Sequence, residues 1–428
     1  MNLELVAAVV LYAAILVAVG LWLPKKLAGF DSFFLGSRQV GAPRVAFSLV
    51  ASWIGAASLL VSTDEAFRSG MSAFWIIGLP AVATLLLFLF LTGPIRALGG
   101  ATISDRMEDR YGRAARPVMT FLIVWYMMVL AGSQMVAAGE FLGTMLGTSY
   151  TISLAVAAAV VLIYTMAGGF VAVVRTHALQ FFLLAAGVLG LVASLAHRSS
   201  WRDVGLASAR LGKAGYFSFF AGGERNALMA LSFILAWTIS PIAWQRIQSA
   251  RSTSSARLGL AGAAAALAVF YAGIVAAGML FLPLSPQGTV AGPLVIATIR
   301  LQAGSPLAGL IFVTVLAAVL STMAAAVNTG AFSLARDLIR YSRGTIPAAR
   351  ELVLGRAATL FLGAGAFLVA VRFKDILTTL GLASKVMAEG LFIPGLAALL
   401  LKKTSRLAGL LSMGAGGGYA LICFFGEA

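Results

Sequence analysis

Apolar stretches of about 20 residues recur along the whole chain of 428 residues, and this feature most limits what the chain can fold into. A helix needs about 20 mostly apolar residues to cross the ~30 Å hydrocarbon core of a membrane. Because backbone polar groups must be satisfied internally there, repeated runs of this length predict an all-α integral membrane protein. About twelve transmembrane helices are expected, near residues 3–24, 42–66, 72–95, 115–146, 149–168, 171–197, 227–247, 256–284, 305–338, 353–371, 375–401 and 406–426.

The composition agrees with this class, since 61% of the residues are hydrophobic and only 11% are charged. Soluble domains carry about 25% charged residues. The net charge of +16 resembles that of nucleic-acid-binding proteins, but the basic residues cluster in short loops between spans, which is a topology signal. The first apolar run has no basic region before it and no cleavage site after it, so we expect a retained helix. We expect a lipid bilayer around the protein, no nucleic acid and no obligate protein partner.

The basic loops also predict how the chain is oriented in the cell (inner) membrane. Loops after the first, third, seventh, ninth and eleventh spans lie on one side, which the positive-inside rule identifies as the cytoplasm. Their basic residues are Lys25, Lys26, Arg38, Arg44, Arg96, Arg106, Arg110, Arg113, Arg116, Arg246, Arg251, Arg257, Arg336, Arg340, Arg343, Arg350, Arg356, Lys402, Lys403 and Arg406. Both termini are then expected outside, in the extracellular or periplasmic space. The loop 198–226 is the exception, because it is basic and lies on the outer side.

Motifs of several catalytic classes are missing from the sequence. It contains no Walker motif, no HExxH and no Ser/His/Asp constellation, and its only histidines are His177 and His197. An ATP-driven pump or a hydrolase needs such parts. The single cysteine, Cys423, allows no internal disulfide. We therefore expect a protein that is not an enzyme.

Two of the expected spans contain residues that weaken a helix at corresponding positions. The second span reads AFSLVASWIGAASLLVSTDEAF, with Gly55 in its middle, and the seventh reads LAWTISPIAWQR, with Pro241. Taken singly, each is more simply explained as a structural kink, which is frequent in membrane helices. Each of these spans opens a run of five, however, and interrupted helices at matching places in two halves indicate a transporter site built on inverted repeats.

The ninth span carries hydroxyl groups inside a long apolar run. In AAVLSTMAAAVN (317–328), Ala318, Ser321 and Thr322 are three and four residues apart, so they share one helix face. Hydroxyl and carbonyl oxygens are the donors that a small hard cation requires. The alternative is that each hydroxyl bonds the carbonyl one turn back, as serine and threonine often do in helices.

Together these residues resemble the sodium/solute symporter family, whose fold is the leucine-transporter fold of two inverted five-helix repeats with broken helices. The resemblance is carried by DSFFLGSRQVGAPRVAFSLVASWIGAASLL, ATISDRMEDRYG, YTMAGGFVAVVRTHALQ, ISPIAWQRIQSARS and LAAVLSTMAAAVNTGAFSLARDL, in the family's order. It implies a single transmembrane transporter domain over 1–428. Its expected parts are a first helix and loop (1–40), repeat 1 (41–197), an extracellular loop (198–226), repeat 2 (227–401) and a last helix (402–428).

The resemblance also implies an ion site where the broken second span meets the ninth. The carbonyls of Ala51, Ile54 and Ala318 and the hydroxyls of Ser321 and Thr322 would hold Na⁺. One position departs from the family, which usually has Thr-Asp where this chain has Thr176-His177. A neutral histidine supplies no negative charge, and histidine titrates near neutral pH, so the choice between Na⁺ and H⁺ coupling stays open.

Further candidates lie near the breaks and in the eleventh span. Trp53, Ser58, Trp237 and Ser240 flank the two breaks and suit a small polar organic solute. Lys385 and Glu389 fall four residues apart near the centre of the eleventh span. They form an intrahelical pair, or Lys385 contacts an anionic group of the substrate. We assign His177, Pro241 and Glu389 to coupling or gating.

The expected function is secondary active transport by alternating access, with Na⁺ coupled to a small organic solute. Sugars, amino acids, carboxylates and vitamins all remain open as substrates. The nearest alternatives are a proton-coupled transporter of the same fold and a transporter-like solute sensor.

Overall fold

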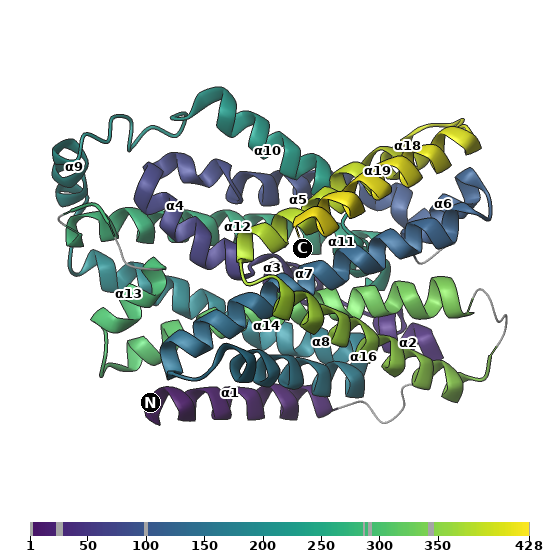
Figure 1. The fold of residues 1–428 in the computed structure, drawn as a ribbon, viewed down its shortest axis with the longest axis horizontal. Coiled ribbons are helices and arrows are strands. Elements are labelled where there is room, and N and C mark those ends of the chain that lie inside the picture. The colour runs from purple at the N-terminus through teal and green to yellow at the C-terminus, as the bar shows by residue number, and fades with distance from the viewer. Residues whose placement is uncertain are drawn as a thin grey trace.

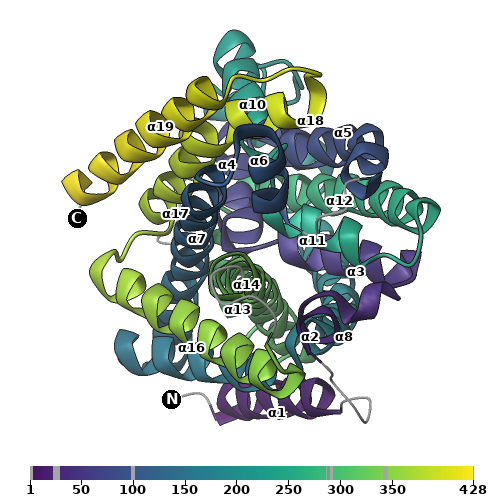
Figure 2. The ribbon, with the colours of Figure 1, turned by 90° about the vertical axis from the view of Figure 1, so that its right-hand side faces the viewer.

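The computed structural model describes residues 3–22, 29–97, 102–285, 287–289, 293–340 and 346–427. Within these ranges every named element is a helix, and one isolated β-bridge joins Val40 to Ala250. The long helices run along the longest dimension of the molecule (Figure 1), and seen end-on they surround α14, Pro306–Ser333 (Figure 2). The expected all-α fold class is confirmed.

The first half of the chain begins with a helix at the edge of the bundle and then enters the first broken span. Its elements are α1 (Leu3–Leu21), α2 (Gly29–Leu35), η1 (Gly36–Arg38), α3 (Ala42–Trp53), η2 (Ala57–Val61), α4 (Ser62–Ser69), η3 (Gly70–Trp75), α5 (Gly78–Ala97), α6 (Ile103–Tyr111), α7 (Ala115–Leu146) and α8 (Tyr150–Ala196).

The second half follows a short helix, α9, and opens with the second broken span. Its elements are α9 (Trp201–Arg210), α10 (Gly223–Trp237), α11 (Pro241–Ser249), α12 (Thr253–Phe281), η4 (Leu282–Leu284), α13 (Leu294–Leu301), α14, η5 (Leu334–Arg340), α16 (Ala348–Arg372), α17 (Ile376–Lys385), η6 (Val386–Phe392), α18 (Ile393–Leu400) and α19 (Arg406–Glu427). We call the end with α9 and α13 the outer end and the end with α2 and α6 the inner end, after the predicted orientation (Figure 1).

The number of spans depends on how the longest helices are counted. In the described ranges nine helices are long and apolar enough to cross a membrane, or ten if α10 and α11 form one bent span. The helix α8 counts once, although its 47 residues make it about 70 Å long at 1.5 Å per residue. It bends at Gly169, between two of the predicted spans, where φ is 53°. A Cβ there would lie 2.2 Å from the Phe33 carbonyl oxygen, so the bend needs glycine. The count of twelve stays a prediction.

Burial separates a central helix from peripheral ones. In an apolar 18-residue stretch of the span that contains α14, 89% of the residues are buried. In the corresponding stretches of α1 and α19, only 22% and 28% of the residues are buried. A helix that is apolar all round belongs inside a protein or in lipid. The centre of the bundle therefore forms around α14, and α1 and α19 present their apolar side chains outward.

Both expected helix breaks are present. The helix α3 ends at Trp53, Ile54 has non-helical dihedrals (φ −88°, ψ 87°), and helical structure resumes at Ala57. The helix α10 ends at Trp237, α11 begins at Pro241, and the two are bent by 49°. Proline lacks an N–H group and fits the first position of a helix, which explains why the second break ends where it does.

Candidate functional site

The first broken span contacts the hydroxyl-bearing face of α14. Ala318 and Ser321 are fully buried there. The Ser321 hydroxyl lies 2.5 Å from the carbonyl oxygen of Ala51 and 3.0 Å from that of Ala318. Three of the five predicted ion ligands therefore converge, and they come from segments about 270 residues apart in the sequence.

The other two predicted ligands, Ile54 and Thr322, lie at the break itself. Ile54 donates its N–H to Val50, but its carbonyl accepts no hydrogen bond from the described residues. The Thr322 hydroxyl is buried and has no partner among those residues either. A Cβ placed on Gly55 would lie 3.0 Å from this hydroxyl, so the break approaches α14 closely.

This set of oxygens fits a small monovalent cation. All five candidate ligands are neutral carbonyl or hydroxyl oxygens, the donor type that hard cations take. A buried hydroxyl without a partner costs about 1–3 kcal/mol, and a bound cation would remove that penalty at Thr322.

His177 lies directly beside these ligands and is fully buried on α8. Its Nε2 lies 3.0 Å from the carbonyl oxygen of Ser321, and its Nδ1 lies 3.1 Å from the hydroxyl of Ser48. Because a carbonyl can only accept, Nε2 carries the proton and Nδ1 accepts from Ser48. The histidine therefore supplies no negative charge to the candidate ion site.

A small cavity of about 90 Å³ opens beside the two breaks. None of its lining side chains carries a charge, and several are hydroxyl-bearing or aromatic. They are Ser52, Trp53, Gly55, Ala57, Ser58, Ile77, Tyr126, Leu130, Gln134, Phe233, Trp237, Ser240, Ile242, Thr322, Leu380 and Ser384. The four predicted substrate residues at the breaks are all in this set. Thr322, a predicted ion ligand, lines the cavity as well.

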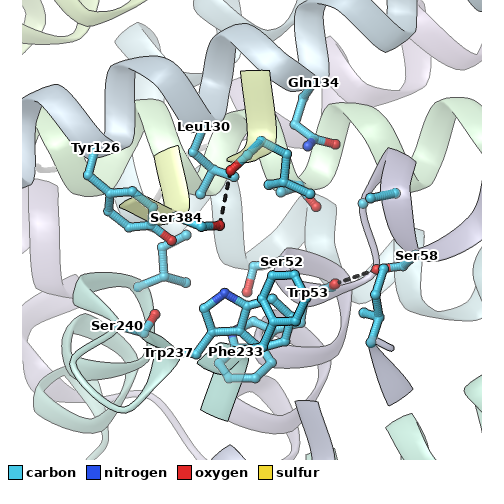
Figure 3. Close-up of a pocket in the computed structure, with 16 residues that line it drawn as sticks. Ser52, Trp53, Ser58, Tyr126, Leu130, Gln134, Phe233, Trp237, Ser240 and Ser384 are labelled. Carbon is cyan, nitrogen blue, oxygen red and sulfur yellow. Dashed lines mark hydrogen bonds between the residues drawn. The ribbon is translucent and has the colours of Figure 1, made fainter. Parts of the chain in front are cut away.

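Aromatic rings form one wall of the cavity. The rings of Trp53 and Trp237 meet edge to face with centroids 5.6 Å apart, and Phe233 lies 5.2 Å from Trp237. Figure 3 shows these three rings together, opposite Tyr126 and Gln134. Edge-to-face pairs stabilise one another, so these rings hold one another in place along this wall.

The two predicted serines already have partners in the protein. Ser58 donates to the Trp53 carbonyl (3.0 Å) and accepts from the hydroxyl of Tyr271 (2.8 Å). Ser240 caps α11 by accepting from the N–H of Ala243 (3.3 Å). Both hydroxyls thus shape the breaks as well as lining the cavity.

Gln134 is a cavity residue that the sequence analysis missed. Its side-chain oxygen accepts the N–H of Ala56 at 2.9 Å, which satisfies a donor freed by the first break. The available signal was the pair Ser133-Gln134 inside the otherwise apolar run MMVLAGSQMVAAG. A polar residue within a span is by default a functional candidate, and this one is almost completely buried.

The remaining predicted residues lie apart from the cavity. Lys385 ends α17, and Glu389 lies in η6, which packs against α19. Neither residue lines the cavity, so a contact between Lys385 and substrate stays a prediction. Pro241 begins α11 and is buried, and its gating role also stays a prediction.

A second cavity, of about 590 Å³, lies further out along α4 and α7. Its walls include the carboxylates of Asp64 and Glu140 and the guanidinium of Arg300, contributed by α4, α7 and α13. Asp64 accepts the N–H of Leu294 at 2.7 Å. Charged residues therefore line this second cavity, whereas no charged residue lines the small cavity beside the two breaks.

Comparison with known proteins agrees with this architecture. A model of the sodium:solute symporter family matches residues 33–416. The chain is 25% identical over 395 residues to the high-affinity proline transporter PutP of Bacillus subtilis (strain 168), an alignment that takes in 86% of this chain and 81% of that protein. It is 25% identical over 198 residues to the high-affinity choline transporter 1 of Drosophila melanogaster, which covers 44% of this chain and only 31% of the relative.

The fold also has a close counterpart among solved structures. The substrate-bound, outward-open structure of a Na⁺-coupled sialic acid symporter superposes with a TM-score of 0.78. The two chains are 18% identical, and the superposition covers 98% of each. At this identity the likeness establishes the leucine-transporter fold alone. The family match, however, spans both broken helices, α14 and the cavity between them, and the chain belongs to the sodium:solute symporter family.

Proposed function

We propose that this protein is a Na⁺-coupled symporter that carries a small polar organic solute across the cell membrane by alternating access. The observation that carries this proposal is the junction of the first break with α14. There the Ser321 hydroxyl reaches the Ala51 carbonyl, and the Thr322 hydroxyl is buried without a partner among the described residues. This junction supports a cation as the coupling partner, held by Ala51, Ile54, Ala318, Ser321 and Thr322.

The energy available from one Na⁺ is sufficient for uptake. A membrane potential of about 100 mV contributes ~2.3 kcal/mol per charge. A tenfold ion gradient adds ~1.4 kcal/mol. The sum of about 3.7 kcal/mol supports a solute gradient of several hundredfold.

The cavity favours a solute without net charge. None of its sixteen lining residues is charged, and an unpaired charge in such a place would be costly. The aromatic wall suits the apolar part of a solute, and the hydroxyls and Gln134 suit its polar groups. Among the solutes in the relatives' names, proline is a small zwitterion without net charge, whereas choline is a cation and sialic acid is a larger anion. A cavity of about 90 Å³ therefore favours a molecule with the size and charge of proline.

Thr322 gives the two binding events a shared residue. It is an ion ligand in this proposal, and it also lines the solute cavity. An ion that draws Thr322 toward the broken helix would fix one wall of the cavity before the solute arrives. Ligand binding shifts a conformational equilibrium only through such differential contacts.

The test is uptake into proteoliposomes driven by a Na⁺ gradient, with proline as the first probe, choline as the charged comparison and a wider solute screen after them. We expect Na⁺-dependent uptake that the Ser321→Ala/Thr322→Ala double variant loses. Thr314→Val is the matched control on the same helix, because its hydroxyl bonds Leu310 and Leu183 away from the ion site. Unchanged Na⁺ dependence in the double variant would remove the ion-site proposal.

The same vesicles separate the alternatives. Uptake that follows a pH gradient and ignores Na⁺ would favour proton coupling. Solute binding without any uptake would favour a sensor.

A further inference from the structure

Arg246 is a buried arginine of α11. The charge pattern predicts that it belongs to a basic cytoplasmic loop, and that prediction is wrong. The structure places it inside α11 with none of its surface exposed. In the part of the chain that the structure describes, no carboxylate forms an ion pair with it. A buried, unpaired charge is costly and is by default functional within a membrane span.

Neutral groups hold the guanidinium in place. Its nitrogens lie 3.2 Å from the Ser48 hydroxyl, 3.0 Å from the Gln245 side-chain oxygen and 3.2 Å from the Thr329 hydroxyl. The guanidinium also lies over the ring of Phe170, 5.3 Å from its centroid. One terminal nitrogen, Nη2, has no hydrogen-bond partner among the described residues. These partners orient the positive charge and leave it uncompensated.

A directed chain of hydrogen bonds connects this charge to the candidate ion site. Arginine can only donate, so Arg246 Nε donates to Ser48, and the Ser48 hydroxyl donates to His177 Nδ1. The Nε2–H of His177 then donates to the carbonyl of Ser321, whose hydroxyl is a predicted ligand. Every hydrogen bond in this chain is donated in the direction from Arg246 toward α14. The arginine sets that direction because it can only donate.

The arginine also lies near the ion ligands on the other helix. Ser48, which accepts from Arg246, precedes Ala51 by three residues on α3, so about one helical turn separates them. Two like charges repel about four times more strongly at an effective dielectric constant of about 20 than in bulk water. The guanidinium of Arg246 would therefore repel a cation bound at Ala51 and Ser321.

We propose that Arg246, oriented by Ser48, Gln245 and Thr329 and linked to the ligands through His177, is a positioning residue that sets the affinity of the candidate site for Na⁺. Its fixed positive charge lowers that affinity, and no carboxylate at position 177 offsets it. The site then holds one Na⁺ and releases it inward without the loss of a carboxylate contact. This inference rests on the proposed function, because it concerns the same ion.

The experiment compares His177→Asp with His177→Asn, a pair of nearly identical shape that differs in charge. The measured quantity is the half-saturating concentration of ²²Na⁺ in direct binding to purified protein, with Na⁺-driven uptake as a second readout. We expect His177→Asp to bind Na⁺ at least tenfold more tightly than His177→Asn, because the carboxylate both offsets Arg246 and attracts the cation directly. Equal affinities for the two variants would overturn the inference.

A second pair, Arg246→Lys and Arg246→Gln, tests the charge at its source. Lysine keeps the positive charge, so we expect an affinity near that of the wild type. Glutamine removes it, and we expect an increase of at least tenfold. An equal affinity for these two would also overturn the inference. If the wild-type protein binds no Na⁺, the proposed function itself fails. If the wild-type protein binds Na⁺ but the two variants of each pair bind it with equal affinity, only the role of Arg246 is removed.

Discussion

The two helix breaks look alike in the sequence and differ in what holds them. At the first break, the partners belong to other helices: Gln134 of α7 accepts the N–H of Ala56, and Ser321 of α14 contacts the Ala51 carbonyl. At the second break, the partners are local: Thr238 bonds the carbonyl of Ile234, and Ser240 caps α11. The first break is therefore fixed by the bundle, and the second by its own chain.

Burial differs between the helices that lead into the two breaks, although α11, which follows the second break, is buried throughout. Six of the twelve residues of α3 are buried, but only two of the fifteen residues of α10 are. A segment with few buried contacts opens at low cost in free energy. If the proposed ion site is correct, this comparison predicts that the first break responds to the ion and that α10, before the second break, moves more readily.

The largest effect is expected where the first break meets α14. In Gly55→Ala, the new methyl group would lie 2.7 Å from the Gln134 oxygen and 3.0 Å from the Thr322 hydroxyl. Overpacking of this kind costs about 1–3 kcal/mol. We expect the strain to fall on the ion-bound junction, where it would lower the Na⁺ affinity by about 5- to 150-fold. The measurement is Na⁺-dependent uptake as a function of Na⁺ concentration. Gly309→Ala, on α14 with no atom within 4 Å of the new Cβ, is the matched control. Wild-type Na⁺ dependence in Gly55→Ala would show that the junction does not bind the ion.

The next effect concerns the tie between the first break and α7. Gln134→Met keeps the length of the side chain but removes the acceptor for Ala56 N–H. A buried donor without a partner costs about 1–3 kcal/mol. We expect the free energy of unfolding in detergent to fall by that amount. A loss no larger than that of Ser240→Ala, described below, would contradict the stronger anchoring of the first break.

The sequence predicts the parts of this architecture that depend on local chemistry. Gly55 and Pro241 mark the breaks because glycine and proline weaken a helix wherever they occur. The spacing of Ala318, Ser321 and Thr322 predicts a shared face because helix geometry alone sets it. The resemblance then supplied the pairing of that face with the first break, which spacing alone does not give.

The sequence alone does not predict contacts between segments that lie far apart along the chain. Gln134 reads as one polar residue in an apolar run, and its bond to Ala56 exists only after α7 packs on the break. Arg246 reads as a loop charge, and its burial depends on Ser48 and Thr329 from two other helices. Lys385 and Glu389 read as midspan charges, yet they lie outside the lining of the solute cavity. Each of these outcomes depends on tertiary contacts rather than on local pattern.

A smaller effect is expected at the second break, where the cap of α11 is local. Ser240→Ala removes the oxygen that accepts the N–H of Ala243. Loss of such a cap costs about 1 kcal/mol, whereas Ser240→Thr keeps the oxygen and serves as the control. We expect lower thermal stability with unchanged Na⁺ binding in the absence of solute. A large change in Na⁺ affinity would show that the second break also contributes to the ion site.

The smallest effect is expected at Thr238, which gives the sharpest contrast with Thr322. The Thr238 hydroxyl donates to the Ile234 carbonyl at 2.7 Å, and the Thr238 N–H donates to the same carbonyl at 3.0 Å. In Thr238→Val the carbonyl keeps its backbone donor, so no polar group is left unsatisfied and the change should stay below about 0.5 kcal/mol. Thr322→Val is the same substitution on α14, and there it removes a predicted ion ligand. We expect Thr238→Val to retain wild-type Na⁺-driven uptake and Thr322→Val to lose most of it. Equal losses in the two variants would mean that both breaks are tied to the ion, and the division between a sensing break and a moving one would have to be abandoned.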